Sequence, residues 1–407
     1  MDLTMRNEYL KTIQPRYLKA SKEEKGKILD EFCQNTRQNR KYVIRKLSPR
    51  ASLKSGLKKA REKVYDHQAI AKLAEVWEIM DYPCGQRLEA VLPEMVDKLS
   101  ACGEFQASDE IVEKLKKISP ATIDRRLAQQ KEYLHRKKFA TTKPGTLLKA
   151  QIPIRLTEWD LNKIGFCEID LVAHCGDNVF GDFLNTLNLT EISTGWSEQA
   201  AILGKSQRNT FSGLMALKQR LPFKLLGLDS DNGSEFINAH LLSYCQKERI
   251  EFTRSRPNKK NDNAYVEQKN WTHVRKLIGY QRLDNPSQLK ALDNLYANEL
   301  RFYKNFFCPT MKLIKKERIG SKIVKKYEKA KTPYRRLVES DQTSPEVKAQ
   351  LKNTYNQLNP AALKRNIDLK LKQIKSNNFT NLKSNLKIEP ATVTNYVIER
   401  IPARLPF

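Results

Sequence analysis

The stretch Phe166-Cys167-Glu168-Ile169-Asp170-Leu171-Val172 decides the fold class of this chain. Its apolar residues predict a buried strand, and similar segments follow at 183–189 and 196–203, with turn-rich polar sequence between them. The pattern then predicts a helix, a strand, a helix, a strand and two helices, at about 206–220, 225–228, 234–246, 250–253, 263–278 and 286–303. This order predicts a central α/β domain over residues 160–310.

Asp170 lies in the middle of an apolar strand, where an ionised carboxylate is costly unless it is paired or binds a metal. Asp231 follows the predicted fourth strand, within Leu228-Asp229-Ser230-Asp231-Asn232-Gly233-Ser234-Glu235-Phe236. The Asn-Gly pair allows a sharp turn there, so Asp231 is expected at the carboxyl end of the strand. Open α/β sheets bind their ligands at this edge.

Glu267 lies on the helix predicted after a polar loop, and Asn263 and Asn270 share its face, directed toward the sheet. Phosphodiester cleavage and strand transfer are in-line displacements that two metal ions can catalyse, and Mg²⁺ prefers oxygen ligands. Taken singly, Asp231 fits a turn residue and Glu267 a surface residue. Three carboxylates from separate elements of a basic protein predict instead a site for Mg²⁺ or Mn²⁺, with two ions.

The segment from about 165 to 310 resembles the catalytic core of the retroviral-integrase superfamily, as found in bacterial insertion-sequence transposases. Three features carry the resemblance: the strand aspartate Asp170, the motif from Ser230 to Phe236, and the helical Glu267. Between Asp231 and Glu267 lie 35 residues, which is the spacing of the DD(35)E signature. Asp229 is a rival for the second ligand, but it breaks this spacing and would lie deeper in the strand.

The resemblance covers a little over a third of the chain and implies an RNase H-like fold. It also implies cleavage and transfer of DNA strands by a metal-bound catalytic triad of Asp170, Asp231 and Glu267. Strand transfer needs paired active sites, so a homo-oligomer on double-stranded DNA, both element ends and target, is expected. The zinc-binding N-terminal module of retroviral integrases has no counterpart here, so no zinc is carried over.

The composition agrees with a polyanionic partner. The 407 residues include 74 Lys and Arg against 46 Asp and Glu, which gives a net charge of +28. Charge alone leaves open another basic protein, such as a ribosome-associated one. No segment approaches the ~18–20 apolar residues of a membrane span, and no signal peptide is evident. We therefore expect no membrane partner and a location in a prokaryotic cytoplasm, at the nucleoid when DNA is bound.

The seven cysteines and five histidines are scattered, without any Cys-x-x-Cys pair. This spacing predicts neither a zinc finger nor a disulfide framework. Reduced, mostly buried thiols are expected.

Residues 1–60 predict a helix-turn-helix DNA-binding region. Ser21-Lys22-Glu23-Glu24 forms a capping box, and a polar break at 34–36 precedes a basic helix at about 37–47. Val43, Ile44 and Leu47 are expected to face inward. The predicted DNA contacts are Arg37, Arg40, Lys41 and Arg45. A small helical hairpin with a solvated basic face would have the same pattern.

Residues 61–145 predict a second helical DNA-binding region. An apolar stripe from Ile70 to Trp77 indicates a packed helix, and Ser119-Pro120 predicts the start of another that carries Arg125 and Arg126. This last helix, with the basic run 135–138, fits a DNA-reading helix or an ordinary solvated one equally well. A linker is expected at 141–145.

Basic residues also surround the predicted site. Further DNA contacts are expected from Arg254, Arg256, Lys259, Lys260 and Lys269, unless the loop 254–261 is simply solvated. Trp196 and Trp271 are expected in the core. The region 311–407 is predicted to be basic, mostly helical and partly flexible, with loose order over 366–390.

Three functions fit these features. The first is a DNA transposase that binds the terminal repeats of its element through the N-terminal helices. The second is a nuclease or resolvase of the same fold that cuts without joining. The third is a catalytically inactive DNA-binding repressor, against which the intact set of carboxylates argues.

Overall fold

The computed structural model describes residues 3–49, 64–128, 130, 163–231, 233–255, 263–319 and 321–376. Contacts divide the chain into two compact units, Met1–Val64 and Tyr65–Phe407. The second unit has a continuous hydrophobic core that joins its N-terminal helices, its sheet and its C-terminal helices. Among the described residues, no helix is both long and apolar enough to cross a membrane.

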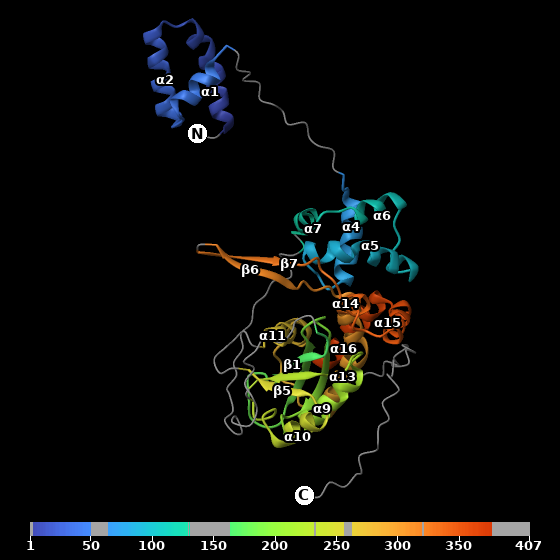
Figure 1. The fold of residues 1–407 in the computed structure, drawn as a ribbon. Helices are drawn as coiled ribbons and strands as arrows, with labels where there is room; N and C mark the ends of the chain where they lie inside the picture. The colour runs from blue at the N-terminus through green and yellow to red at the C-terminus, as the bar shows by residue number, and fades with distance from the viewer. Residues whose placement is uncertain are drawn as a thin grey trace, which may run out of the picture. The chain divides into compact units, whose positions relative to one another are not determined.

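The described part of the first unit, residues 3–49, forms the helices α1 (Leu3–Lys19), α2 (Lys22–Thr36) and α3 (Arg40–Leu47) (Figure 1). Its core consists of Leu10, Leu29, Phe32, Val43 and Leu47. The predicted capping box is confirmed, because the backbone N–H of Glu24 donates to the Ser21 hydroxyl and the backbone N–H of Ser21 donates to the Glu24 carboxylate. The helix-turn-helix geometry itself stays a prediction.

Two expectations for this unit were wrong. The polar break does not fall at 34–36, because α2 continues to Thr36 and ends at Arg37, whose φ of 53° is left-handed. Asn39 then caps α3. Ile44 does not face inward: it is 42% exposed, because Val43 and Leu47 already occupy the buried face at a spacing of one helical turn.

The second unit begins with four helices: α4 (His67–Ile79), α5 (Gly85–Ala101), α6 (Asp109–Lys116) and α7 (Pro120–Arg126). Trp77 is buried, as its stripe predicts, and Ser119 caps α7 with Pro120 in its first turn. The run 135–138 and the linker 141–145 lie outside the described residues.

A five-stranded mixed sheet follows, formed by β1 (Phe166–Ala173), β2 (Leu184–Glu191), β3 (Ser197–Leu203), β4 (Gly227–Ser230) and β5 (Glu251–Arg254). Its order is β3-β2-β1-β4-β5, with β1, β2 and β3 antiparallel and β4 and β5 parallel to β1. With α9 (Gln207–Arg220) and α10 (Ala239–Lys247), the predicted succession of strands and helices is confirmed. The fourth strand lies two residues later than expected, which places Asp229 inside it.

The two faces of the sheet differ in chemistry. One face is largely apolar: Leu187 of β2 and Ile202 of β3 lie against Gly213 of α9. The other face is polar and, apart from the half-buried Asp170, it is buried. It carries Glu168, Asp170, Thr186, Asn188, Thr190, Ser197, Gln199, Asp229 and Thr253. Buried polar groups need hydrogen-bond partners, so this face requires a polar cover.

The cover comes from helices after the fifth strand. They are α11 (Ala264–Lys269), α12 (Lys276–Ile278), α13 (Pro286–Leu295) and the π-helical turns η1 (Asn270–Arg275), η2 (Tyr296–Leu300) and η3 (Tyr303–Phe307). Tyr265, Val266, Asn270 and Tyr296 all bond to side chains of the polar face. A π-helical turn widens the helix locally and is frequent at functional sites.

The C-terminal region contains β6 (Leu313–Ile319), β7 (Lys322–Tyr327), α14 (Pro333–Glu339), α15 (Pro345–Gln357) and α16 (Pro360–Ser376). The prediction of a mostly helical C-terminal region was therefore wrong for 313–327, because these residues form a β-hairpin. The β-branched pair Ile323-Val324 and the Gly320-Ser321 dipeptide in the sequence favour strands around a turn.

The prediction that residues 366–390 are loosely ordered was wrong for 366–376. These residues belong to α16, which buries Ile367, Leu371 and Ile374, and its Lys370 pairs with Glu299. Residues 377–390 lie outside the described part of the chain.

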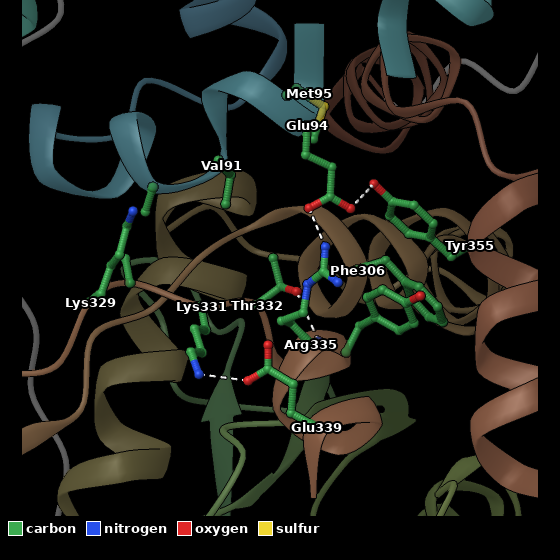
Figure 2. A pocket seen from close by; sticks show the side chains of 13 residues that line it. Val91, Glu94, Met95, Phe306, Lys329, Lys331, Thr332, Arg335, Glu339 and Tyr355 are labelled. Atoms are coloured by element: carbon green, nitrogen blue, oxygen red, sulfur yellow. Dashed lines mark hydrogen bonds and ion pairs between the residues drawn. The ribbon is translucent and has the colours of Figure 1, made fainter. Parts of the chain in front are cut away.

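Helix α5 is joined to the C-terminal helices through Glu94 (Figure 2). Its carboxylate accepts hydrogen bonds from Arg335 of α14 and Tyr355 of α15, beside a pocket that contains none of the predicted triad. A second joint is Asp81, between α4 and α5, which pairs with Lys276 and Lys304.

All seven cysteines are free, as predicted. The expectation that most are buried was wrong. Only Cys167 and Cys245 are buried, and Cys84 is exposed.

Candidate active site

Asp170 and Asp231 come together because their strands are parallel neighbours. Ile169 of β1 pairs with Ser230 of β4, so the residues that follow them, Asp170 within β1 and Asp231 just after β4, lie side by side at the carboxyl end of β4. Burial and, second, the charge of Asp231 raise the pKa of Asp170 to about 7. Burial also raises the pKa of Asp231, although the backbone N–H of Gly233 donates to its carboxylate at 2.9 Å.

Glu267 lies on α11 with an exposed side chain, and its charge adds to the rise in the pKa of Asp170. The structure thus brings the three carboxylates into electrostatic contact, although they come from β1, the end of β4 and a helix. Asp229 is fully buried in β4 and accepts a hydrogen bond from Thr253. The Asp229 carboxylate is thus engaged inside the sheet, and the choice of Asp231 over Asp229 stays a prediction.

Helix α11 is fixed to the sheet by Glu168, two residues before Asp170 on the same face of β1. The Glu168 carboxylate accepts hydrogen bonds from the backbone N–H groups of Tyr265 and Val266, at 2.9 and 3.0 Å. A carboxylate at a helix N-terminus satisfies N–H groups that lack intrahelical partners. Glu168 therefore sets where α11 begins, and with it the position of Glu267 beside Asp170.

A chain of hydrogen-bonded side-chain amides runs across the polar face of the sheet, from the edge strand β3 to Asp170. Gln199 of β3 donates to Asn188 of β2 at 2.9 Å, Asn188 donates to Asn270 at 2.8 Å, and Asn270 donates to Asp170 at 2.6 Å. Every donor points toward the carboxylate, so each bond polarises the next one. The last bond lowers the pKa of Asp170 against the larger effect of burial.

The donor set fits a hard divalent cation, because carboxylate oxygens are what Mg²⁺ and Mn²⁺ prefer. The repulsion that raises the pKa of Asp170 is what a bound cation would relieve. Among the residues that the structure describes, no three Asp, Glu, His or Cys side chains are grouped closely enough to hold an ion as they stand. The three carboxylates therefore interact electrostatically without forming a closed metal site.

Two of the predicted DNA contacts were wrong. Lys269 is 5% exposed, and burial lowers its pKa to about 7, because it lies on the opposite side of α11 from Glu267. Arg254 is 7% exposed and ends β5, where it pairs with Ser230. The strand β5 ends at Arg254, so it includes the residue that was predicted to begin the loop.

The other predicted contacts divide into three groups. Arg37, Arg40, Lys41, Arg45 and Arg125 are exposed, and Arg40 forms an ion pair with Asp30. Arg126 is half-buried. Arg256, Lys259 and Lys260 lie outside the described residues.

Trp196 is 2% exposed, so its assignment to the core is confirmed. The same expectation for Trp271 was wrong, because its side chain is 53% exposed. Trp271 lies four residues after Glu267, so the two side chains are neighbours on the helix. The spacing of four residues from Glu267 is the sequence signal that could have placed Trp271 at the site.

Lys205 was also missed. This exposed residue lies between β3 and α9, and its charge lowers the pKa of Asp231. No sequence signal connected it with the site.

Comparison with known proteins gives one relative over most of the chain, and no family model matches. The chain is 34% identical over 328 residues to the uncharacterized protein y4rM of Sinorhizobium fredii (strain NBRC 101917 / NGR234). This match covers 80% of the chain and 93% of y4rM. The chain therefore belongs to the same family as y4rM.

Among solved structures, the chain is similar to the HTLV-2 integrase catalytic core domain in complex with magnesium, at 16% identity and a TM-score of 0.27 over 40% of this chain and 93% of that one. It is also similar to the catalytic core domain of BIV integrase, at 17% identity and a TM-score of 0.29 over 47% and 99% of the two chains.

Proposed function

We propose that this member of the y4rM family is a DNA transposase that cuts and joins DNA strands with divalent metal ions bound by Asp170, Asp231 and Glu267. The observation that carries the proposal is the convergence of these carboxylates. Asp170 in the middle of β1 lies beside Asp231 at the carboxyl end of the parallel strand β4, and the charges of Asp231 and Glu267 both raise the pKa of Asp170. Two or more interacting acids at one edge of a sheet are typical of a catalytic site.

In this proposal the three carboxylates supply the oxygen ligands for two Mg²⁺ or Mn²⁺ ions. Ions bound there would activate the attacking oxygen and stabilise the leaving oxygen of an in-line phosphoryl transfer. Asn270 holds one oxygen of Asp170 in place, and Gly233 holds one oxygen of Asp231. The exposed cation Lys205, close enough to lower the pKa of Asp231, is placed to attract a DNA phosphate.

The remaining parts of the proposal concern DNA. The element ends or their phosphates are contacted by basic residues of the N-terminal helical regions: Arg37, Arg40, Lys41, Arg45, Arg125 and Arg126. DNA near the site is contacted by Arg256, Lys259 and Lys260. The two ends of the element are processed by a homo-oligomer, in the cytoplasm of a prokaryote. The net charge of +28 supports a polyanionic substrate.

The test is a strand-transfer assay with labelled duplex ends of the element, in Mg²⁺ or Mn²⁺. We expect metal-dependent joined product from wild type and none from Glu267→Gln, while both bind the DNA equally. The matched control is Glu113→Gln, which removes the same charge from an exposed glutamate on α6 and should leave joining unchanged.

Two other results would replace the proposal. Cleavage without joining would identify a nuclease or resolvase of this fold. DNA binding with neither reaction in either metal would identify a DNA-binding repressor.

A further inference from the structure

The hairpin of β6 and β7 is exposed on both of its faces. Every described side chain from Leu313 to Tyr327 is exposed, and Figure 1 shows the two strands extending from the rest of the second unit. A two-stranded hairpin without a covered face is marginally stable in water. Within the part of the chain that the structure describes, the hairpin therefore presents both of its faces to solvent.

The register of the hairpin sets like charges opposite each other. Lys315 pairs with Lys326 and Lys316 with Lys325, and neighbouring residues of a strand point to opposite faces. Lys315 and Lys326 are therefore directly opposed on one face, where Lys315 also pairs with Glu317, and Lys325 lies on the other face. Like charges that lie directly opposite each other destabilise a hairpin in isolation. Residues 313–327 hold six basic residues against one acidic residue, Glu317. A polyanion would turn these repulsions into favourable contacts.

The base of the hairpin is tied to the catalytic sheet by Arg336. Its side chain is 8% exposed and donates hydrogen bonds to Glu328, to Thr310 and to the backbone carbonyl of Thr194. Thr194 belongs to the turn between β2 and β3. Backbone bonds between Thr310 and Lys331 close the base on the other side. The hairpin is thus mounted on the sheet that carries Asp170.

We propose that the β6–β7 hairpin inserts into the major groove of a DNA duplex. This inference rests on the proposed function, because it takes DNA as the substrate. The major groove admits a two-stranded β-ribbon, and the phosphates of both DNA strands flank it. A ribbon with lysines on both faces reaches both rows of phosphates. Ile319, which is 64% exposed at the end of β6 beside the turn, contacts the floor of the groove, where thymine methyl groups are apolar partners.

The experiment measures binding of the full-length protein to a duplex at several salt concentrations. The variant Lys325→Gln/Lys326→Gln removes two hairpin charges, and Lys247→Gln/Lys352→Gln removes two exposed lysines from α10 and α15 as the matched control. Each lost phosphate contact reduces the salt slope of log K by about 0.9, so we expect a slope about 2 smaller for the hairpin variant only. A ligand of the major groove should compete with wild type, and a ligand of the minor groove should not.

Equal slopes and affinities for the two double variants would overturn the inference, provided both melt at the wild-type temperature. Loss of a DNA-free dimer in the hairpin variant, with an unchanged salt slope, would also overturn it, since the hairpin would then join two copies of the chain. The proposed function is tested separately. If the hairpin variant has a smaller salt slope but wild type shows no strand transfer, the hairpin inference is supported and the proposed transposase function is contradicted.

Discussion

Asn270 donates its side-chain amide to Asp170 at 2.6 Å from a position three residues after Glu267. One helix therefore carries both the predicted metal-binding glutamate and the group that orients the strand aspartate. The amide of Asn270 is itself oriented by Asn188, which is held by Gln199. Positions on β3 and β2 thus bear on the geometry at β1, although neither side chain touches the three carboxylates.

Removing the middle of this chain should impair the site without removing a carboxylate. In Asn188→Ala, Asn270 and Gln199 lose buried partners, which costs about 1–3 kcal/mol of stability. The Asn270 amide is then less well oriented, so the pKa of Asp170 should rise further and the pH at half-maximal strand transfer should move above that of wild type. The matched control is Asn185→Ala, on the same strand but bonded to backbone carbonyls on the other face. Equal pH profiles for the two variants would show that the chain is only structural.

Metal binding should depend on pH through Asp170. Its pKa is about 7 in the folded chain, so a cation competes with a proton below that pH. We expect Mn²⁺ affinity, measured by calorimetry, to rise about tenfold per unit up to pH 7 and to level off above it. Asp170→Asn should lower Mn²⁺ affinity and reduce this pH dependence to the part that comes from Asp231, while the exposed control Asp177→Asn should keep both as in wild type.

The same shift has a consequence for stability. The folded chain retains the Asp170 proton over a range, between about pH 4 and pH 7, in which an unfolded carboxyl loses it. The free energy of unfolding should therefore fall as pH rises through this range, and less steeply in Asp170→Asn. Urea unfolding without metal at several pH values measures the difference. A parallel course for the two proteins would contradict the raised pKa.

Trp271 should contact a base of the bound DNA. Its side chain is 53% exposed beside Glu267, and stacking of a base on an aromatic ring contributes about 1–3 kcal/mol. Trp271→Ala should weaken binding of the DNA end about tenfold or more, and Trp271→Phe should retain most of it. Trp77 and Trp196 are buried and Trp159 lies outside the described residues, so the assay uses a Trp159→Phe background, in which DNA-induced quenching of tryptophan fluorescence should be lost on adding Trp271→Phe. Unchanged quenching in that variant would exclude stacking on Trp271.

Asp81 should stabilise the attachment of α4 and α5 to the catalytic domain. The charges of Lys304 and Lys276 outweigh burial and lower the pKa of Asp81. Lys304 is 5% exposed, so Asp81→Asn should reduce the free energy of unfolding by about 3 kcal/mol. Because the folded-state pKa is lowered, this contribution is present above the ordinary carboxyl pKa and is lost as the pH falls through the folded value. Urea unfolding at pH 7 and pH 3 tests it, with the exposed Glu75→Gln as control.

The sequence by itself determined the order of the central strands and helices, since period-two apolar segments and helical stripes are local signals. It also gave Asp170, Asp231 and Glu267 as one group, through the costly strand carboxylate and the spacing of 35 residues. The caps at Ser21 and Ser119 were predictable for the same reason, because a cap depends on residues three positions away.

Only the tertiary structure decided which polar residues are buried together. Glu168, Asn188 and Gln199 lie on strands whose partners are set by register, and their roles depend on a helix about 70–100 residues farther along the chain. The sequence also did not determine which side chains of the helix that carries Glu267 are exposed. Lys269 and Trp271 are two residues apart, yet the lysine is buried and the tryptophan is exposed, because the helix packs one side against the rest of the unit. Local composition favours the opposite arrangement, and long-range packing overrides it.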